Sequence, residues 1–76
     1  MPRLKSLPTA RVLKALARAG WDLRPYKKGK RHYVLVNPDR PLILTVPRHR
    51  TVRKGTLAQI IKSAGLTQNQ FRRLYR

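Results

Sequence analysis

Apolar residues recur at helical spacing near both ends of the chain and at strand spacing in its middle. The first helix is expected to follow Pro8, with Thr9 as its N-cap and Gly20 as the residue that ends it. Its buried stripe comprises Val12, Leu13, Leu16 and Ala17. The opposite side carries a cationic ridge, either a solvated face or a surface that follows a phosphate backbone, formed by Arg11, Lys14 and Arg18.

Three short strands are expected next, at residues 21–25, 32–36 and 42–46. Trp21 is expected in the core, and Pro25 ends the first strand or confines it to an edge. The turn between the second and third strands is rich in Asn, Pro and Asp, which favour turns, so these strands form an antiparallel hairpin. With the first strand they make a three-stranded meander that can bury one face beneath helices.

Two further helices are expected in the last third of the chain. The second helix begins at Gly55–Thr56 and ends at Gly65, with a buried stripe of Leu57, Ile60, Ile61 and Ala64. The third helix is short, and Thr67 and Gln70 have the spacing of a capping box at its start. It is expected to bury Phe71, Leu74 and Tyr75 and to extend the positive surface with Arg72, Arg73 and Arg76.

This order of elements predicts a single α+β domain over residues 1–76. It is an α-β-β-β-α sandwich, in which a three-stranded antiparallel sheet carries helices on one face and a short C-terminal helix follows. The order is compatible with the double-stranded-RNA-binding (dsRBD-like) type of fold, although unrelated domains share it. So small a domain has a thin hydrophobic core, and without cysteine it has no disulfide to support that core.

The charge of the chain limits the kinds of partner that it is expected to bind. There are 19 Lys and Arg residues against 2 acidic ones, for a formal net charge of +17. A strongly basic balance is typical of nucleic-acid binding, whereas a surface kept only for solubility would mix both signs. Charge alone does not separate RNA from DNA or from an acidic protein. No apolar run approaches the ~20 residues that span a bilayer, so we expect no membrane association and a cytoplasmic protein.

The candidate chemistry lies in two basic segments that each contain a histidine. In the first, a glycine-containing turn at residues 26–31 leads into a strand at His32. His32 is a candidate for proton transfer, and the cations beside it would stabilise charge on a phosphate: Lys28, Lys30 and Arg31. In the second, His49 is a possible proton donor, phosphate contact or plain loop histidine, among Arg48, Arg50 and Lys54. A structural or incidental role is the alternative for His32 as well.

Metal ions and cofactors are not expected. The two histidines, together with Asp22 and Asp39, lack the close spacing of a tetrahedral metal site. The chain also has no glycine-rich nucleotide-binding loop, and no serine or cysteine within a nucleophile signature.

Three segments of the second half stand at fixed spacing: Val46–His49, Lys54–Leu57 and Ile61–Leu66. They resemble the V-P-x-H, K-G-T-L and I-L-K-x-A-G-L motifs of the HicA-type (YcfA-like) mRNA interferase toxins of type II toxin-antitoxin pairs. The resemblance implies a dsRBD-like domain that cleaves mRNA without a metal. It also implies a catalytic histidine at the start of the second strand, which corresponds to His32, and silencing by a HicB-type antitoxin.

Where the family pattern reads Gly-Ser-His, this chain reads Lys30-Arg31-His32. Because the chain is so basic, the implied antitoxin is expected to be acidic and to cover His32 and its surrounding cations. Two other functions stay open. One is a non-catalytic RNA-binding module of the same fold, which recognises RNA shape and backbone. The other is a basic ribosomal or chromosomal accessory protein.

Overall fold

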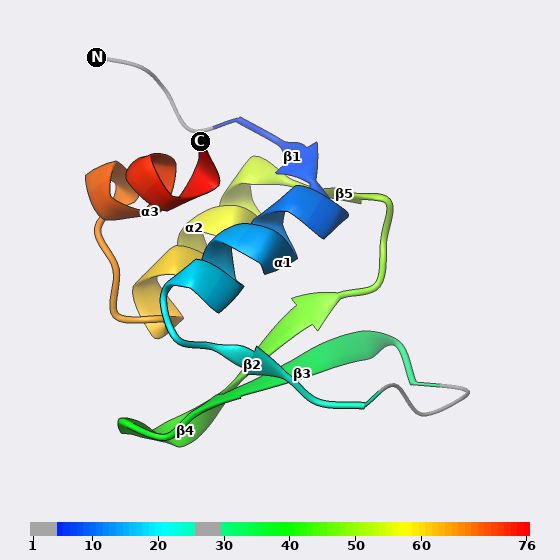
Figure 1. Ribbon diagram of the computed structural model, residues 1–76. Helices are drawn as coiled ribbons and strands as arrows, with labels where there is room; N and C mark the ends of the chain where they lie inside the picture. The colour runs from blue at the N-terminus through cyan, green and yellow to red at the C-terminus, as the bar shows by residue number, and fades with distance from the viewer. Residues whose placement is uncertain (1–4, 26–29) are drawn as a thin grey trace.

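The computed structural model describes residues 5–25 and 30–76 and has three helices above one face of a small sheet (Figure 1). The elements along the chain are β1 (Leu7–Pro8), α1 (Thr9–Arg18), β2 (Asp22–Leu23), β3 (His32–Asn37), β4 (Arg40–Pro47), β5 (Thr51–Val52), α2 (Lys54–Ser63) and α3 (Gln68–Tyr75). The predicted α+β class is confirmed, with a three-stranded antiparallel sheet, helices on one face and a short C-terminal helix, consistent with a dsRBD-like fold.

The sheet has the order β2-β3-β4, with both neighbouring pairs antiparallel. β3 and β4 form the predicted hairpin, in which His32 lies opposite Pro47 and Leu35 opposite Leu44. The first predicted strand is shorter than residues 21–25, because only Asp22–Leu23 pair regularly as β2. The hydrogen bond from the Arg24 backbone N–H to the Val34 carbonyl, at 2.8 Å, extends this contact by one residue.

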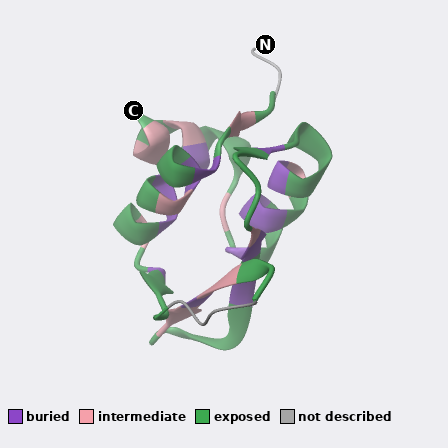
Figure 2. Ribbon diagram, turned by 90° about the vertical axis from the view of Figure 1, so that its right-hand side faces the viewer, coloured by how far each residue is buried: buried purple, intermediate pink, exposed green. Residues whose placement is uncertain are grey.

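The core lies between the sheet and the helices, where the buried residues in Figure 2 face one another. Trp21 is 1% exposed, and this confirms its predicted core position. The apolar residues of the β3–β4 hairpin and of α2 meet it as predicted, and the fully buried Phe71 brings α3 into the same cluster. These contacts fix the ends of β3 and β4, from which the candidate site is built.

The start of α1 differs from the prediction. Thr9 is the first residue of the helix, Pro8 takes the N-cap position, and no side chain caps the helix. The Thr9 side chain is 4% exposed, and its hydroxyl donates a hydrogen bond to the His49 carbonyl instead. The predicted burial of Ala17 was also wrong: Ala17 is exposed, and Ala15 is buried in its place. α1 packs against β1, β2, β5 and α3, and the side of the helix that these elements cover includes Ala15 and not Ala17.

A pairing between β1 and β5 was not predicted. Leu7 lies opposite Val52 and Pro8 opposite Thr51 in this two-stranded antiparallel pair. Figure 1 shows the pair at the same end of the molecule as the start of α1. It holds the segment after β4 against the start of α1, so the predicted basic loop at residues 47–54 contains a short strand.

The ends of α2 and α3 follow the sequence signals. α2 begins at Lys54, one residue before the predicted start, and Gly65 adopts a left-handed φ of 77° just after its C-cap. The capping box of α3 is confirmed: the Gln70 backbone N–H donates to the Thr67 hydroxyl at 3.1 Å, and the Thr67 N–H donates to the Gln70 side chain at 2.8 Å.

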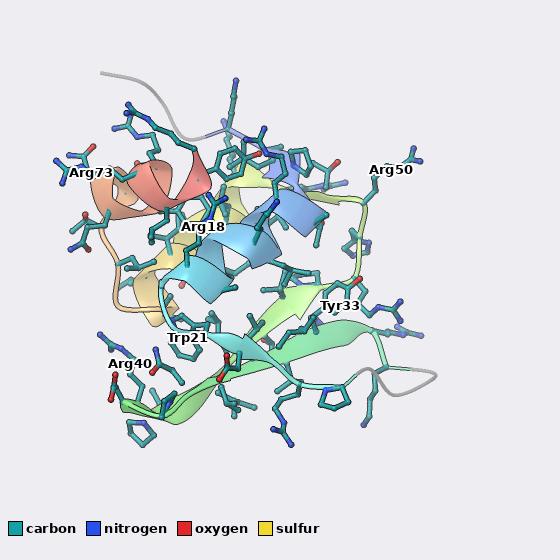
Figure 3. All side chains as sticks on the ribbon, in the orientation of Figure 1. Arg18, Trp21, Tyr33, Arg40, Arg50 and Arg73 are labelled. Atoms are coloured by element: carbon teal, nitrogen blue, oxygen red, sulfur yellow. The ribbon has the colours of Figure 1, made fainter. Side chains whose placement is uncertain are left out.

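Two arginines of the predicted ridge on α1 contact α3. Arg18 donates hydrogen bonds to the backbone carbonyls of Leu74 and Arg76, each at 2.6 Å (Figure 3). The Arg11 guanidinium lies 4.3 Å from the centre of the Tyr75 ring. Carbonyl groups at a helix C-terminus carry partial negative charge, which favours a nearby cation. Arg11 and Arg18 therefore join α1 to α3.

Candidate functional site

His32 is the first residue of β3 and lies opposite Pro47, the last residue of β4. Side chains alternate between the two faces of a strand, so His32 lies on the other face from the buried Leu35. His32 is exposed, and it lines three of the surface hollows of the described chain. His32 is therefore a lining residue that all three hollows share.

The first space, which we call the loop hollow, combines both histidines with three cations. Its lining residues are Lys30, Arg31, His32, Arg48 and His49. They come from the start of β3 and from the segment after β4, two parts of the chain that the hairpin register brings together. A hollow surrounded by this charge suits a phosphate, which guanidinium and ammonium groups bind by charge-assisted hydrogen bonds.

The second space, the β2 hollow, lies between the end of β2 and the start of β3. Its lining residues are Arg24, Pro25, Lys30, Arg31, His32, Tyr33 and Val34. The third space, the α2 hollow, lies between the β3–β4 hairpin and one side of α2. It is lined by His32, by Ile43, Leu44, Thr45 and Pro47 of β4, and by Thr56, Gln59, Ile60 and Ser63 of α2.

The segment that carries His49 is fixed to the residues just before β3 by its neighbour Arg48. The Arg48 backbone N–H donates to the Arg31 carbonyl at 2.9 Å, and the Arg48 guanidinium donates to the Lys30 carbonyl at 3.2 Å. The same guanidinium lies 5.2 Å from the centre of the Tyr33 ring, a cation–π arrangement. Figure 3 shows Tyr33 and Arg50 on the same side of the molecule. These contacts close the end of the hairpin next to His32.

On its other side, the segment is fixed to the start of α1. The Thr9 hydroxyl donates to the His49 carbonyl, and the Thr9 backbone N–H donates to the Arg50 carbonyl at 3.0 Å. A solvated loop makes its backbone hydrogen bonds to water, whereas here three consecutive residues bond to the segment before β3 and to the start of α1. The backbone of His49 is therefore held in place beside the loop hollow.

Four of the predicted site residues gather with His32 in the loop hollow: Lys30, Arg31, Arg48 and His49. Arg50 and Lys54 are exposed but line none of the three hollows. Lys28 lies outside the described residues. Sequence reasoning missed Arg24 and the polar residues of α2, because a single arginine or a neutral side chain on an exposed helix face carries no motif.

Proton transfer and phosphate binding are the chemistry that this arrangement offers. His32 is exposed, and lysine and arginine residues line two of the hollows that it borders. Within residues 5–25 and 30–76, no group of three or more His, Cys, Asp or Glu side chains is arranged to hold a metal ion. In the same ranges, no helix has the length and apolar character that crossing a membrane requires.

Comparison with known proteins identifies the family. A search of curated proteins found no match to the chain. The family model described as the HicA toxin of bacterial toxin-antitoxin matches residues 9–66, a span that contains His32, His49 and all three segments with family-like motifs, and that ends before α3. Because this match covers well over half of the sequence, the chain belongs to the HicA toxins of bacterial toxin-antitoxin systems.

Proposed function

We propose that this HicA-family toxin is an mRNA interferase: an endoribonuclease that cleaves mRNA without a metal ion and uses His32 for proton transfer. The observation that carries the proposal is the position of His32. It is an exposed imidazole bordered by Lys30 and Arg31 in two hollows and by Arg48 in one of them. The family match supports a toxin, and the charge of +17 supports a polyanionic substrate.

The reaction is an attack within the RNA strand. A base takes the proton of a ribose 2′-hydroxyl, and the 2′-oxygen then forms a bond to the adjacent phosphorus. The bond from phosphorus to the 5′-oxygen breaks, and an acid gives that oxygen a proton. The products are a 2′,3′-cyclic phosphate and a 5′-hydroxyl. Negative charge builds on the phosphate during the attack, and Lys30, Arg31 and Arg48 stabilise it from the loop hollow.

The mechanism needs two proton-transfer groups, and the loop hollow contains two histidines. His32 fills one role. His49 fills the other or binds the phosphate, and its fixed backbone supports the first of these possibilities, because acid catalysis requires a positioned group. The requirement for a 2′-hydroxyl makes RNA, and not DNA, the substrate.

The antitoxin partner is proposed to be an acidic HicB-type protein that covers His32 and the loop hollow. A cationic surface of this size attracts an acidic partner over long range and favours fast association. Mixing the toxin with its partner is expected to block RNA cleavage and RNA binding together. Full RNA binding by the complex would show that the partner binds at another surface.

The test of the proposed function is His32→Ala, measured for RNA cleavage in the presence of a chelator and for growth arrest on expression. We expect cleavage to fall by about 10²–10⁴-fold, the usual contribution of one acid or base, while RNA binding is retained. Lys14→Ala is the control, because Lys14 is an exposed cation of α1 outside all three hollows. Unchanged cleavage in the His32 variant would refute the assignment.

A non-catalytic RNA-binding module remains the second candidate, and one observation favours it. Lys30 and Arg31 stand where the family pattern has Gly and Ser, and both line two hollows at His32. Added cations at this position strengthen backbone binding without any chemical step. This candidate predicts that the wild-type protein binds RNA with a steep salt dependence and leaves the RNA intact.

A further inference from the structure

The three hollows that meet at His32 differ in charge. Lys30 and Arg31 line both the loop hollow and the β2 hollow, and each of these hollows has a further arginine, Arg48 or Arg24. The described residues that line the α2 hollow include no lysine or arginine at all. In a chain where 19 of 76 residues are Lys or Arg, this neutral surface directly beside the cationic ones is a distinct feature.

The side of α2 that faces this hollow presents neutral hydrogen-bonding groups. Thr56, Gln59 and Ser63 stand at i, i+3 and i+7, so they lie along one helix face, and all three are exposed. Hydroxyl and amide groups can each donate and accept hydrogen bonds. On the strand side, Ile43 is 62% exposed and adds an apolar surface.

We propose that the α2 hollow is a nucleobase-binding subsite, which holds the base of the nucleotide next to the scissile phosphate of a single-stranded RNA. The proposal rests on the proposed function for the position of that phosphate at His32. Phosphate contacts position a nucleic acid, and contacts to base edges select its sequence. The cationic hollows suit the first task, and the neutral α2 hollow suits the second.

The chemistry of a base fits this surface better than that of a phosphate. A base is uncharged, has a flat apolar face, and carries donors and acceptors side by side along its edge. The Gln59 amide offers one donor group and one acceptor in a matching arrangement. Single-stranded RNA exposes its base edges, whereas the deep, narrow major groove of an RNA duplex hides them, so the expected substrate is single-stranded.

The first experiment measures binding without cleavage. RNA strands of equal length containing only A, only C or only U carry 2′-fluoro groups, which remove the attacking hydroxyl, and their affinities are measured by fluorescence anisotropy. We expect the wild-type affinities for the best and worst base to differ by about fivefold or more, the value of one net hydrogen bond. Gln59→Ala is expected to remove most of this difference. Gln68→Ala, an exposed glutamine of α3, is the matched control and should keep it.

The second experiment maps cleavage positions on one mixed-sequence RNA. Gln59→Ala is expected to spread cleavage more evenly over the bases next to the cut, whereas Gln68→Ala keeps the wild-type pattern. Equal affinity for all bases, or a preference that persists in Gln59→Ala, would overturn the subsite. So would a Gln59 variant that loses only antitoxin binding, which would assign the hollow to the protein partner. If the wild type cleaves no RNA, the proposed function fails, and the 2′-fluoro binding experiment still decides whether the hollow binds a base.

Discussion

The hydroxyl of Thr9 donates a hydrogen bond to the carbonyl of His49, 40 positions away in the chain. It joins the first turn of α1 to the segment that carries the second histidine of the loop hollow. The Thr9 backbone N–H reinforces this junction through the Arg50 carbonyl. Helix α1 lies outside the candidate site, but it therefore positions His49, which belongs to that site.

Thr9→Val is expected to weaken both the fold and the activity. Valine keeps the shape of threonine but leaves the His49 carbonyl without its donor, at a cost of about 1–3 kcal/mol in the free energy of unfolding. Urea unfolding measures this change. We also expect slower RNA cleavage at temperatures where the variant is folded. Thr51→Val is the control: Thr51 is an exposed threonine of β5, and its replacement should change stability by no more than about 0.5 kcal/mol.

His49→Ala is expected to slow cleavage by about 10²–10⁴-fold, because one of the two proton-transfer groups is lost. The other residues that line the loop hollow with His49 are Lys30, Arg31, His32 and Arg48, so Arg48→Lys, which preserves the positive charge, serves as the comparison. A His49 variant that cleaves RNA at the wild-type rate would limit this residue to a loop role.

Two glycines at the ends of α2 are expected to respond to alanine with opposite signs. Gly65 has a φ of 77°, and a Cβ placed there would lie 2.1 Å from the Arg40 guanidinium. Gly65→Ala is therefore expected to destabilise the fold by about 1–2 kcal/mol, mainly through the left-handed backbone. Gly55 has no atom within 4 Å of a new Cβ, so Gly55→Ala is expected to stabilise the fold by about 0.5–1 kcal/mol. Thermal unfolding of both variants measures the two shifts, and shifts of the same sign would contradict this account.

Arg31→Ala is expected to reduce the salt dependence of RNA binding. Each cation that neutralises a phosphate of a single strand adds about 0.7 to the slope of log affinity against log salt, so this variant should lose about that amount. Arg73→Ala is the control, because Figure 3 shows Arg73 on the opposite side of the molecule from Tyr33, the neighbour of His32. Equal losses in both variants would mean that RNA does not select the His32 end of the protein.

Local signals in the sequence predicted much of this fold. The capping box of α3, the glycine that ends α2 and the strand that starts at His32 all depend on residues close together in the chain. Each of these features has its own chemistry: a side-chain cap, a left-handed backbone or a β-branched run. Where a structural feature depends on residues close together in the sequence, the pattern of those residues was sufficient to predict it.

Contacts between distant segments account for the differences. β1 and β5 have two residues each, too few to show any periodicity, and they form because α1 and the end of β4 meet in space. The same meeting turns the Thr9 hydroxyl away from its own helix and toward His49. The α2 hollow was not predicted, because Thr56, Gln59 and Ser63 line a hollow only when the β3–β4 hairpin lies beside them. The convergence of His49 with His32 likewise depended on the hairpin register.

The hydrogen bonds that Arg18 makes to α3 end on main-chain carbonyls and not on side chains. Every residue type supplies the same carbonyl, so the residues at positions 74 and 76 can change without removing an acceptor. The attachment of α3 to α1 through Arg18 therefore does not depend on which side chains stand at these two positions. Replacing Arg76, for instance, would lower the positive charge here while its carbonyl still accepts from Arg18 and the helix stays joined to α1.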